Sequence, residues 1–167
     1  MTEKIARRGL HIHREYGVDP LERHHVADLM TQEVMTIPAA MPIAEVRRRF
    51  FGDAPPHRAY PVVGEGGRLL GVLDRRAIAD APEAGRCQAL VPGVGPEHVL
   101  LPGVSARAAA GKMAALGVSR LAVVQDTAGM RLVGILSLRD LVLPSVATLH
   151  EETLRERLRT VGPPSRR

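Results

Sequence analysis

A serine and an aspartate three residues apart carry the clearest chemistry in this sequence. They are Ser137 and Asp140, within the segment GILSLRDL. The apolar run predicts a buried strand, and the residues after it predict the start of a helix. A helix N-terminus offers unpaired N–H groups and a partial positive charge, which suit a phosphate. A serine hydroxyl there can donate to a phosphate oxygen, and a carboxylate one turn on can accept from both hydroxyls of a ribose.

The same spacing also fits a purely structural motif, the capping box. In that motif the serine caps the helix, and the acidic side chain three residues later reaches back to the serine N–H. Arg139 lies between the two and could add a charge-assisted contact to a phosphate. The residues alone therefore leave two interpretations open, a nucleotide site and a helix cap.

An earlier segment, GVLDRRAI, has the same apolar pattern with different chemistry. It has Asp74 in place of Ser137 and Ala77 in place of Asp140. Aspartate is a good helix cap, so this helix should still start well. Its carboxylate puts negative charge where a phosphate would go, and alanine cannot bind a ribose. We therefore expect at most one nucleotide site, formed by the later copy.

The two segments end the units of an internal repeat. The first unit contains MTIPAAMPIAEVRRRFFG and AYPVVGEGGRLLGVLDRRAI, and the second contains VLLPGVSARAAAGKMAALG and SRLAVVQDTAGMRLVGILSLRDL. In each unit a short strand leads into a helix, two strands follow around a turn, and another helix begins. Helical spacing predicts the first helix over 43–51, while Ser105 and Gly117 are good N- and C-terminal signals for its counterpart. The order predicts an α/β (α+β) fold of two β-α-β-β-α units.

Composition restricts the core and the class of protein. Of 167 residues 45% are hydrophobic, with no Trp, two Phe and two Tyr, so the core should be aliphatic. No apolar run reaches the ~20 residues of a membrane helix, and no signal peptide is visible. The single cysteine, Cys87, excludes an intrachain disulfide and fits a reducing compartment. We expect a packed, unreactive thiol.

The net charge of +5 is concentrated at the two ends of the chain and in Arg47–Arg49. A basic excess fits a nucleic acid, an anionic membrane surface or a solvated face. Aromatic residues that stack on bases are not interleaved with it, so we expect no nucleic-acid partner. A solvated face is the first interpretation, and proximity to a membrane is the second.

Other clusters give weaker signals. The pairs His11/His13 and His24/His25 have no cysteine or acidic partner at ligand spacing, so we expect no metal site. No Walker-type loop, Ser/His/Asp arrangement or pair of carboxylates indicates catalysis, so we expect no enzyme activity.

Taken together, the repeat and its segments YPVVGEGGRLLGVLDRRAI and LAVVQDTAGMRLVGILSLRDL resemble a tandem pair of CBS domains, a Bateman module, over about residues 27–143. The resemblance implies two units packed sheet to sheet around a pseudo-twofold axis and pairing of modules into homodimers. It also implies an adenine nucleotide in a cleft between units: ATP, ADP or AMP as a ligand, with no cofactor required. We expect CBS domain 1 at 26–80 and CBS domain 2, with its linker, at 81–148.

The leader KIARRGLHIHREYGVDPLERHHVADLM resembles the stretch between the last membrane helix of chloride channel (ClC) family proteins and their cytoplasmic CBS pair. Arg-Arg-Gly and the acidic-Pro-Leu before VADLM carry this resemblance. It implies a leader at 1–25, a membrane-embedded channel as partner, a location at the cytoplasmic face of the membrane, and a C-terminal helix and tail at 149–167. The alternatives are a CBS pair of another transporter or of a soluble enzyme, and a stand-alone nucleotide sensor.

The resemblance implies six nucleotide-binding residues: Thr36, His57, Arg58, Ser137, Arg139 and Asp140. Thr36 matches a position that contacts the nucleotide, and His57 and Arg58 match positions beside the adenine. The chain departs from the family here, because His57 replaces a stacking tyrosine and Arg58 replaces a small polar residue. Histidine can stack, but with less area. A solvated loop histidine is the alternative interpretation of His57.

Overall fold

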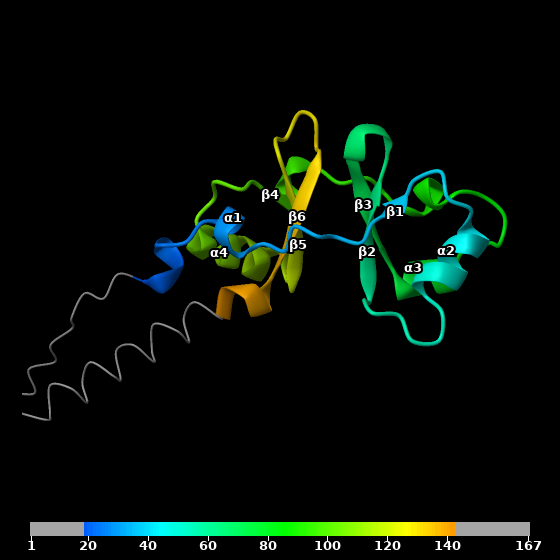
Figure 1. Ribbon diagram of the computed structural model, residues 1–167, viewed down its shortest axis with the longest axis horizontal. Coiled ribbons are helices and arrows are strands. Elements are labelled where there is room, and N and C mark those ends of the chain that lie inside the picture. The colour runs from blue at the N-terminus through cyan, green and yellow to red at the C-terminus, as the bar shows by residue number, and fades with distance from the viewer. Residues whose placement is uncertain (1–18, 143–167) are drawn as a thin grey trace, which may run out of the picture.

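The computed structural model describes residues 19–142 and contains two three-stranded sheets with their helices (Figure 1). The elements of the first unit are β1 (Ile37–Pro38), α2 (Ile43–Phe50), β2 (Ala59–Val63), β3 (Leu69–Asp74) and α3 (Arg75–Ala79). Those of the second are β4 (Val99–Leu100), α4 (Ala106–Leu116), β5 (Arg120–Val124) and β6 (Leu132–Ser137), followed by helical residues 138–142. The predicted β-α-β-β-α order is confirmed in both units.

Shorter elements precede and connect the two units. These are α1 (Val26–Leu29) and the 3₁₀ turns Pro20–Glu22, Glu65–Gly67, Cys87–Leu90 and Pro96–His98. The 3₁₀ turn at 65–67 joins β2 to β3, where the sequence predicted a hairpin turn. Within residues 19–142, none of the helices combines the length and apolarity that a bilayer crossing requires. The predicted leader up to residue 18 and the predicted C-terminal helix and tail at 149–167 lie outside the described residues.

The two sheets have the same topology. In the first, β1 runs parallel to β2, and β2 runs antiparallel to β3; the second repeats this with β4, β5 and β6. Register places Ala59 opposite Asp74 in one hairpin and Arg120 opposite Ser137 in the other. Asp74 and Ser137 therefore occupy equivalent positions at the ends of equivalent strands, as the two copies predicted.

The helix signals in the sequence are also confirmed. The Ser105 hydroxyl accepts a hydrogen bond from Ala108 N at 3.2 Å, and Gly117 ends α4 with a left-handed φ of 65°. Glycine suits this position because other residues are strained there. Helix α2 ends at Phe50, one residue before the predicted boundary, and buries Ile43 and Phe50 on its apolar face.

Each unit has its own buried core, and a third cluster joins them. The second core is aliphatic, as composition predicted, but the first contains an aromatic cluster in which Phe50 and Phe51 each lie 5.2 Å from Tyr60, centroid to centroid. The joining cluster consists of Leu69, Val99, Ala122, Val124 and Met130. Because Leu69 belongs to the first sheet and the others to the second unit, this cluster packs the two units together.

The segment that leads into each unit packs on the other unit. Helix α1 precedes the first unit, yet Val26 is buried in the second core and its N–H donates to Val104 O at 2.8 Å. The turn Cys87–Leu90 precedes the second unit, yet Cys87 is buried in the first core and its N–H donates to Met41 O at 3.0 Å. The units are therefore interlocked, and in Figure 1 the chain from α1 crosses to β1.

Two glycines let these crossing segments pass close to the sheets. A Cβ on Gly134 would lie 2.7 Å from Met30 Sδ and 3.0 Å from Thr31 O, and one on Gly71 would lie 2.8 Å from Val91 Cβ. The separation at Gly71 is shorter than real Cβ atoms show, so a larger residue there forces the crossing segment away. At Gly134 the contact to the backbone oxygen of Thr31 is tight, and the flexible Met30 side chain must shift as well. These are the glycines that open GILSLRDL and GVLDRRAI.

The Cys87 thiol is packed, as predicted. It is fully buried and lies 3.1 Å from Pro38 O and 3.4 Å from Ala39 O, to which it donates. Burial raises the pKa of the Cys87 thiol above its ordinary value, while backbone hydrogen bonds partly oppose this. Because the thiolate is the reactive form, both effects of burial, the raised pKa and the lack of access, keep this cysteine inert in the folded chain.

The glycine crossing gives a direct stability test. Gly134→Ala should lower the free energy of unfolding by about 1–3 kcal/mol, because the added methyl group overpacks the crossing. Gly111→Ala is the control: it lies in α4, where a Cβ would meet nothing within 4 Å. That change should raise stability by about 0.5–1 kcal/mol. Urea unfolding measures both, and equal stability of Gly134→Ala and the parent chain would contradict the close crossing.

Candidate functional site

A cavity of about 360 Å³ lies where residues 31–35 cross the end of β6. We call it the Ser137 cavity. The side chains around it come from both units and from the crossing segment: Thr31, Glu33, Val34, Met35, His57, Ala59, Pro61, Arg120, Ile135, Ser137, Arg139 and Asp140. Its volume is within the range of small-molecule sites.

Ser137 and Asp140 contact each other directly. One carboxylate oxygen, Asp140 Oδ2, accepts from Ser137 N at 2.8 Å and from Ser137 Oγ at 2.7 Å. This is the half of a capping box in which the acid reaches back. The other half, in which the serine hydroxyl accepts from a backbone N–H, is absent within residues 19–142, where the Ser137 hydroxyl instead donates to the carboxylate. The site and cap interpretations are thus compatible, since Asp140 Oδ1 is not used in this pair of bonds.

The equivalent pair in the first unit makes only a cap. Asp74 Oδ1 accepts from Ala77 N at 2.8 Å, as the sequence predicted. Ala77 has no polar side chain that could bind a ribose. The two strand-to-helix junctions share a backbone arrangement and differ in the chemistry they offer.

His57 lies in the Ser137 cavity and is held there by Tyr60. The His57 ring lies 5.5 Å from the Tyr60 ring at 69°, and His57 N donates to the Tyr60 hydroxyl at 3.3 Å. Tyr60 is only 1% exposed, so it is a fixed support. The ring therefore packs against a buried neighbour on one side, but His57 itself is exposed in its loop, so the solvated-loop interpretation stays open.

The other two predicted residues lie elsewhere. Thr36 is half-buried and lines a neighbouring cavity of about 220 Å³ together with Gly134. Arg58 is exposed and lines a cavity of about 680 Å³ that contains Asp74, which we call the Asp74 cavity. The Ser137 cavity therefore brings together His57 and the predicted residues of the GILSLRDL segment, without Thr36 and Arg58. The roles of all six in binding remain predictions.

Sequence reasoning missed several residues of the Ser137 cavity. Met35 is 51% exposed and, with Val34, provides an apolar wall from the crossing segment. Arg120 and Glu33 add charges of opposite sign. Arg120 could have been found, because a hairpin that ends at Ser137 must place the first residue of its partner strand beside it. The residues of the crossing segment could not have been found from the sequence, since the position of that segment depends on tertiary packing.

The family assignment follows from the repeat, the interlocked sheets and a direct match. The model of the CBS domain family matches residues 26–84 and 96–143, which together make up most of the chain. This chain belongs to the CBS domain family. It is a tandem CBS pair, as the sequence resemblance predicted. No curated protein sequence matches it significantly.

Solved structures have the same fold as this CBS pair. The cytosolic domain of the Mg²⁺ channel MgtE in complex with ATP is 30% identical, with a TM-score of 0.59, over 74% of this chain and 50% of that one. CBSX2 in complex with AMP is 18% identical, with a TM-score of 0.61, over 75% and 98%. The soluble part of a magnesium transporter is 16% identical, with a TM-score of 0.60, over 79% and 50%. The chain thus spans half the length of the MgtE cytosolic domain.

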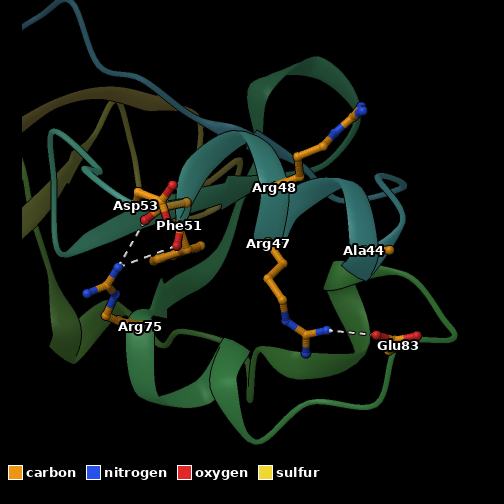
Figure 2. Close-up of a pocket in the computed structure, with 8 residues that line it drawn as sticks. Ala44, Arg47, Arg48, Phe51, Asp53, Arg75 and Glu83 are labelled. Carbon is orange, nitrogen blue, oxygen red and sulfur yellow. Dashed lines mark hydrogen bonds and ion pairs between the residues drawn. The ribbon is translucent and has the colours of Figure 1, made fainter.

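The Arg47–Arg49 run of the CBS pair lies beside a further cavity, of about 510 Å³, shown in Figure 2. Arg47 Nη2 donates to Ile78 O at 3.0 Å and to Ala81 O at 2.9 Å, so it ties α2 to α3. Arg49 forms an ion pair with Glu45 at 2.9 Å. Two arginines of this run therefore have partners within the chain, and the solvated-face interpretation of the basic excess stays a prediction.

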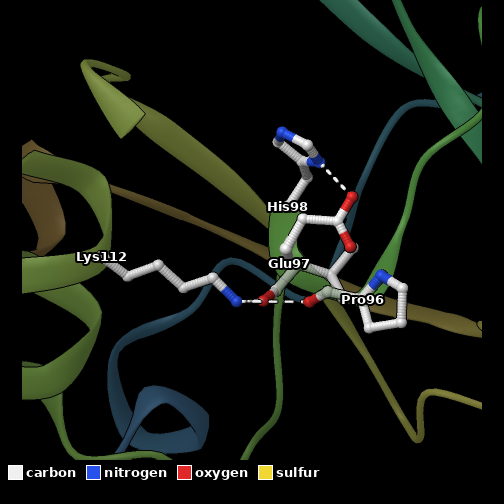
Figure 3. A network of polar contacts seen from close by, with 5 residues as sticks. Pro96, Glu97, His98 and Lys112 are labelled. Carbon is white, nitrogen blue, oxygen red and sulfur yellow. Dashed lines mark hydrogen bonds and ion pairs between the residues drawn. The ribbon is translucent and has the colours of Figure 1, made fainter. Parts of the chain in front are cut away.

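A lysine joins α4 to the start of β4 (Figure 3). Lys112 Nζ donates to Val99 O at 2.6 Å and to Pro96 O at 3.3 Å. Next to it, Glu97 Oε1 lies 3.0 Å from His98 Nδ1. A backbone hydrogen bond lowers the pKa of the Glu97 carboxyl, and His98 and Lys112 lower it further. These contacts fix the 3₁₀ turn that carries His98 into the Asp74 cavity.

No group of three potential metal ligands occurs within residues 19–142. His25 belongs to the cap of α1, since its N–H donates to Asp28 Oδ2 at 2.8 Å. His11 and His13 lie outside the described residues.

We expect removal of the acidic side chain to lower the free energy of unfolding by a similar amount at the two strand-to-helix junctions. Asp140→Ala and Asp74→Ala should each lower the free energy of unfolding by about 1 kcal/mol, because each loses side-chain hydrogen bonds at a helix start. Thermal unfolding measures both. A loss above about 3 kcal/mol for Asp140→Ala would show that Asp140 does more structurally than cap the helix.

Proposed function

We propose that this CBS pair is a non-catalytic regulatory module that binds an adenine nucleotide in the Ser137 cavity. The observation that carries the proposal is the convergence of Ser137, Asp140, two arginines and an anchored histidine on one cavity. These groups match the three parts of a nucleotide: hydroxyls on a ribose, anionic phosphates and a flat base.

Each part of the ligand has a partner in the cavity. Asp140 Oδ1 is the acceptor for the ribose hydroxyls, and the Ser137 hydroxyl turns from the carboxylate to a phosphate oxygen. Arg139 adds a charge-assisted contact to the phosphate. The base lies between the His57 ring and the apolar wall at Met35. A large exposed methionine is suited to a flat ligand because its flexible side chain can adapt to the surface it meets.

Relatives support the ligand class. MgtE and CBSX2 have been crystallised with ATP and AMP, respectively. CBSX2 is too distant to support more than the fold, so the support for a nucleotide comes mainly from MgtE and from the cavity itself. Which of ATP, ADP and AMP binds best is a matter for the titration below.

We further propose that the module is attached to a membrane ion transporter at its cytoplasmic face and acts as a homodimer. The leader sequence favours a chloride channel or antiporter, while the likeness to MgtE favours a magnesium transporter. A bound nucleotide regulates such a partner only if its affinity differs between two arrangements of the module. The coding sequence upstream of Met1 distinguishes the two: about ten hydrophobic spans support the chloride channel, and their absence contradicts it.

Calorimetric titration with ATP, ADP and AMP tests the nucleotide site. We expect binding by the parent chain, loss of binding in Asp140→Ala, and undiminished affinity in Asp74→Ala. The second variant is a matched control, because it removes the equivalent acid from the equivalent junction. No heat and no thermal shift at millimolar nucleotide would overturn the proposed function.

A further inference from the structure

We propose that Arg68 and Arg131 together bind a phosphate group, either free or on a lipid headgroup, where the hairpin turns of the two units meet. We call these two residues the arginine pair. They directly precede β3 and β6, whereas Asp74 and Ser137 end those strands. The arginine pair therefore lies at the far end of the sheets from the Ser137 cavity, and the inference goes beyond the proposed function.

The two arginines occupy equivalent positions in the two units. Gly64 N donates to Arg68 O and Gln125 N donates to Arg131 O, each at 2.8 Å, so each arginine closes the turn of its own hairpin. The two turns lie at the same end of the sheets (Figure 1). There Arg68 and Arg131 pair with each other in an antiparallel bridge. Because equivalent residues pair antiparallel, a local twofold axis passes between them.

The backbone of the arginine pair is fixed by the cluster that joins the units. Leu69 N donates to Met130 O at 2.8 Å, and the side chains of these two residues are buried. Since successive side chains alternate in direction along an extended chain, the neighbouring arginines turn away from the cluster, and both are exposed. A Cβ on Gly67 would lie 3.9 Å from Arg131 Cγ. The backbones that carry the two charges thus cannot separate without opening the contact between the units.

Two unfavourable features coincide at this bridge. Like charges directly opposite each other in an antiparallel pair destabilise it. Met130, next to Arg131, has a φ of 53°, and no other non-glycine residue within 19–142 has a positive φ. That left-handed conformation is unfavourable for a large side chain. Local strain of this kind is retained where a site requires it, so the coincidence points to a ligand that offsets the repulsion.

The described part of the chain supplies no counterion for the arginine pair. None of the ion pairs within residues 19–142 includes either guanidinium. Glu65 in the first turn is exposed, and Asp126 in the second accepts from Gly129 N at 2.6 Å. The arginine side chains that donate hydrogen bonds are others: Arg47, Arg49, Arg75 and Arg86.

A phosphate group fits two guanidiniums on either side of a local twofold axis. Each guanidinium offers donors in a planar fork, which matches two oxygens of a phosphate. A tetrahedral phosphate can present oxygens to both sides at once, whereas a carboxylate has only two oxygens to share between the two forks. Its negative charge also replaces one repulsion by two attractions. The arginine pair therefore favours a phosphate over a single carboxylate.

Thermal unfolding in inorganic phosphate, against sodium chloride of equal ionic strength, tests the arginine pair. We expect about 20 mM phosphate to raise the Tm of the parent chain by about 2–4 °C more than chloride does. Arg68→Gln and Arg131→Gln should each abolish this gain. The double variant should lose no more than either single variant, because one ligand bridges both side chains. Both side chains are exposed, so the variants should fold.

Vesicle sedimentation distinguishes the two sources of phosphate. The probe is phosphatidylcholine vesicles with about one-fifth phosphatidic acid, compared with phosphatidylcholine alone. Binding that is lost in Arg68→Gln and in Arg131→Gln would identify a lipid headgroup as the ligand. A gain in Tm with inorganic phosphate and no vesicle binding would identify free phosphate. Either result supports the site.

Arg76→Gln is the charge-matched control. Arg76 is exposed, lies beyond the far end of β3 and lines none of the cavities described above. We expect this variant to keep the full gain in Tm. An equal loss in Arg76→Gln and in the two test variants would reduce the effect to general charge and overturn the inference.

Two further outcomes would overturn the inference while leaving the proposed function intact. One is a parent chain that shows neither a gain in Tm with phosphate nor binding to the anionic vesicles. The other is a gain that persists in Arg68→Gln and Arg131→Gln but disappears in Arg139→Gln, which would put the phosphate in the Ser137 cavity. Conversely, a chain that binds no nucleotide could still show the gain that depends on the arginine pair, so the two proposals fail separately.

Discussion

Two close crossings of the backbone, one over Gly71 and one over Gly134, are the constraint on which the rest of this CBS pair depends. Each crossing lets a leading segment leave its own unit and complete the core of the other. Neither core is complete without the partner unit, so the two repeats should fold as one cooperative body. The crossings also create the cavities, because residues 31–35 and 92–94 form walls that no single unit could provide.

The two strand-to-helix junctions have the same backbone arrangement but different side chains. A strand must end and a helix must start at each junction, and either Asp74 or the Ser137–Asp140 pair meets that need. Folding therefore leaves the side chains at these junctions free to vary. In the second unit they form a set of donors and acceptors that suits a nucleotide, while in the first they place a lone carboxylate beside an apolar cavity.

Much of the fold could be predicted because its signals are local. The repeat order, the cap at Ser105, the stop at Gly117 and the equivalence of the two junctions all depend on residues near in sequence. The interlocking of the units could not, because it depends on contacts between distant segments. For the same reason the cavity takes Val34 and Met35 from the crossing segment, whereas Thr36 lies in a neighbouring cavity. The direction of the Ser137 hydroxyl bond could not be predicted either, since a serine can donate or accept.

The account places a nucleotide in the Ser137 cavity and none in the Asp74 cavity. A crystal structure of the chain with AMP tests this most directly. The account predicts ribose hydroxyls on Asp140, the base beside His57, and the phosphate beside Ser137 and Arg139. AMP bound in the Asp74 cavity, or bound outside both cavities, would contradict it.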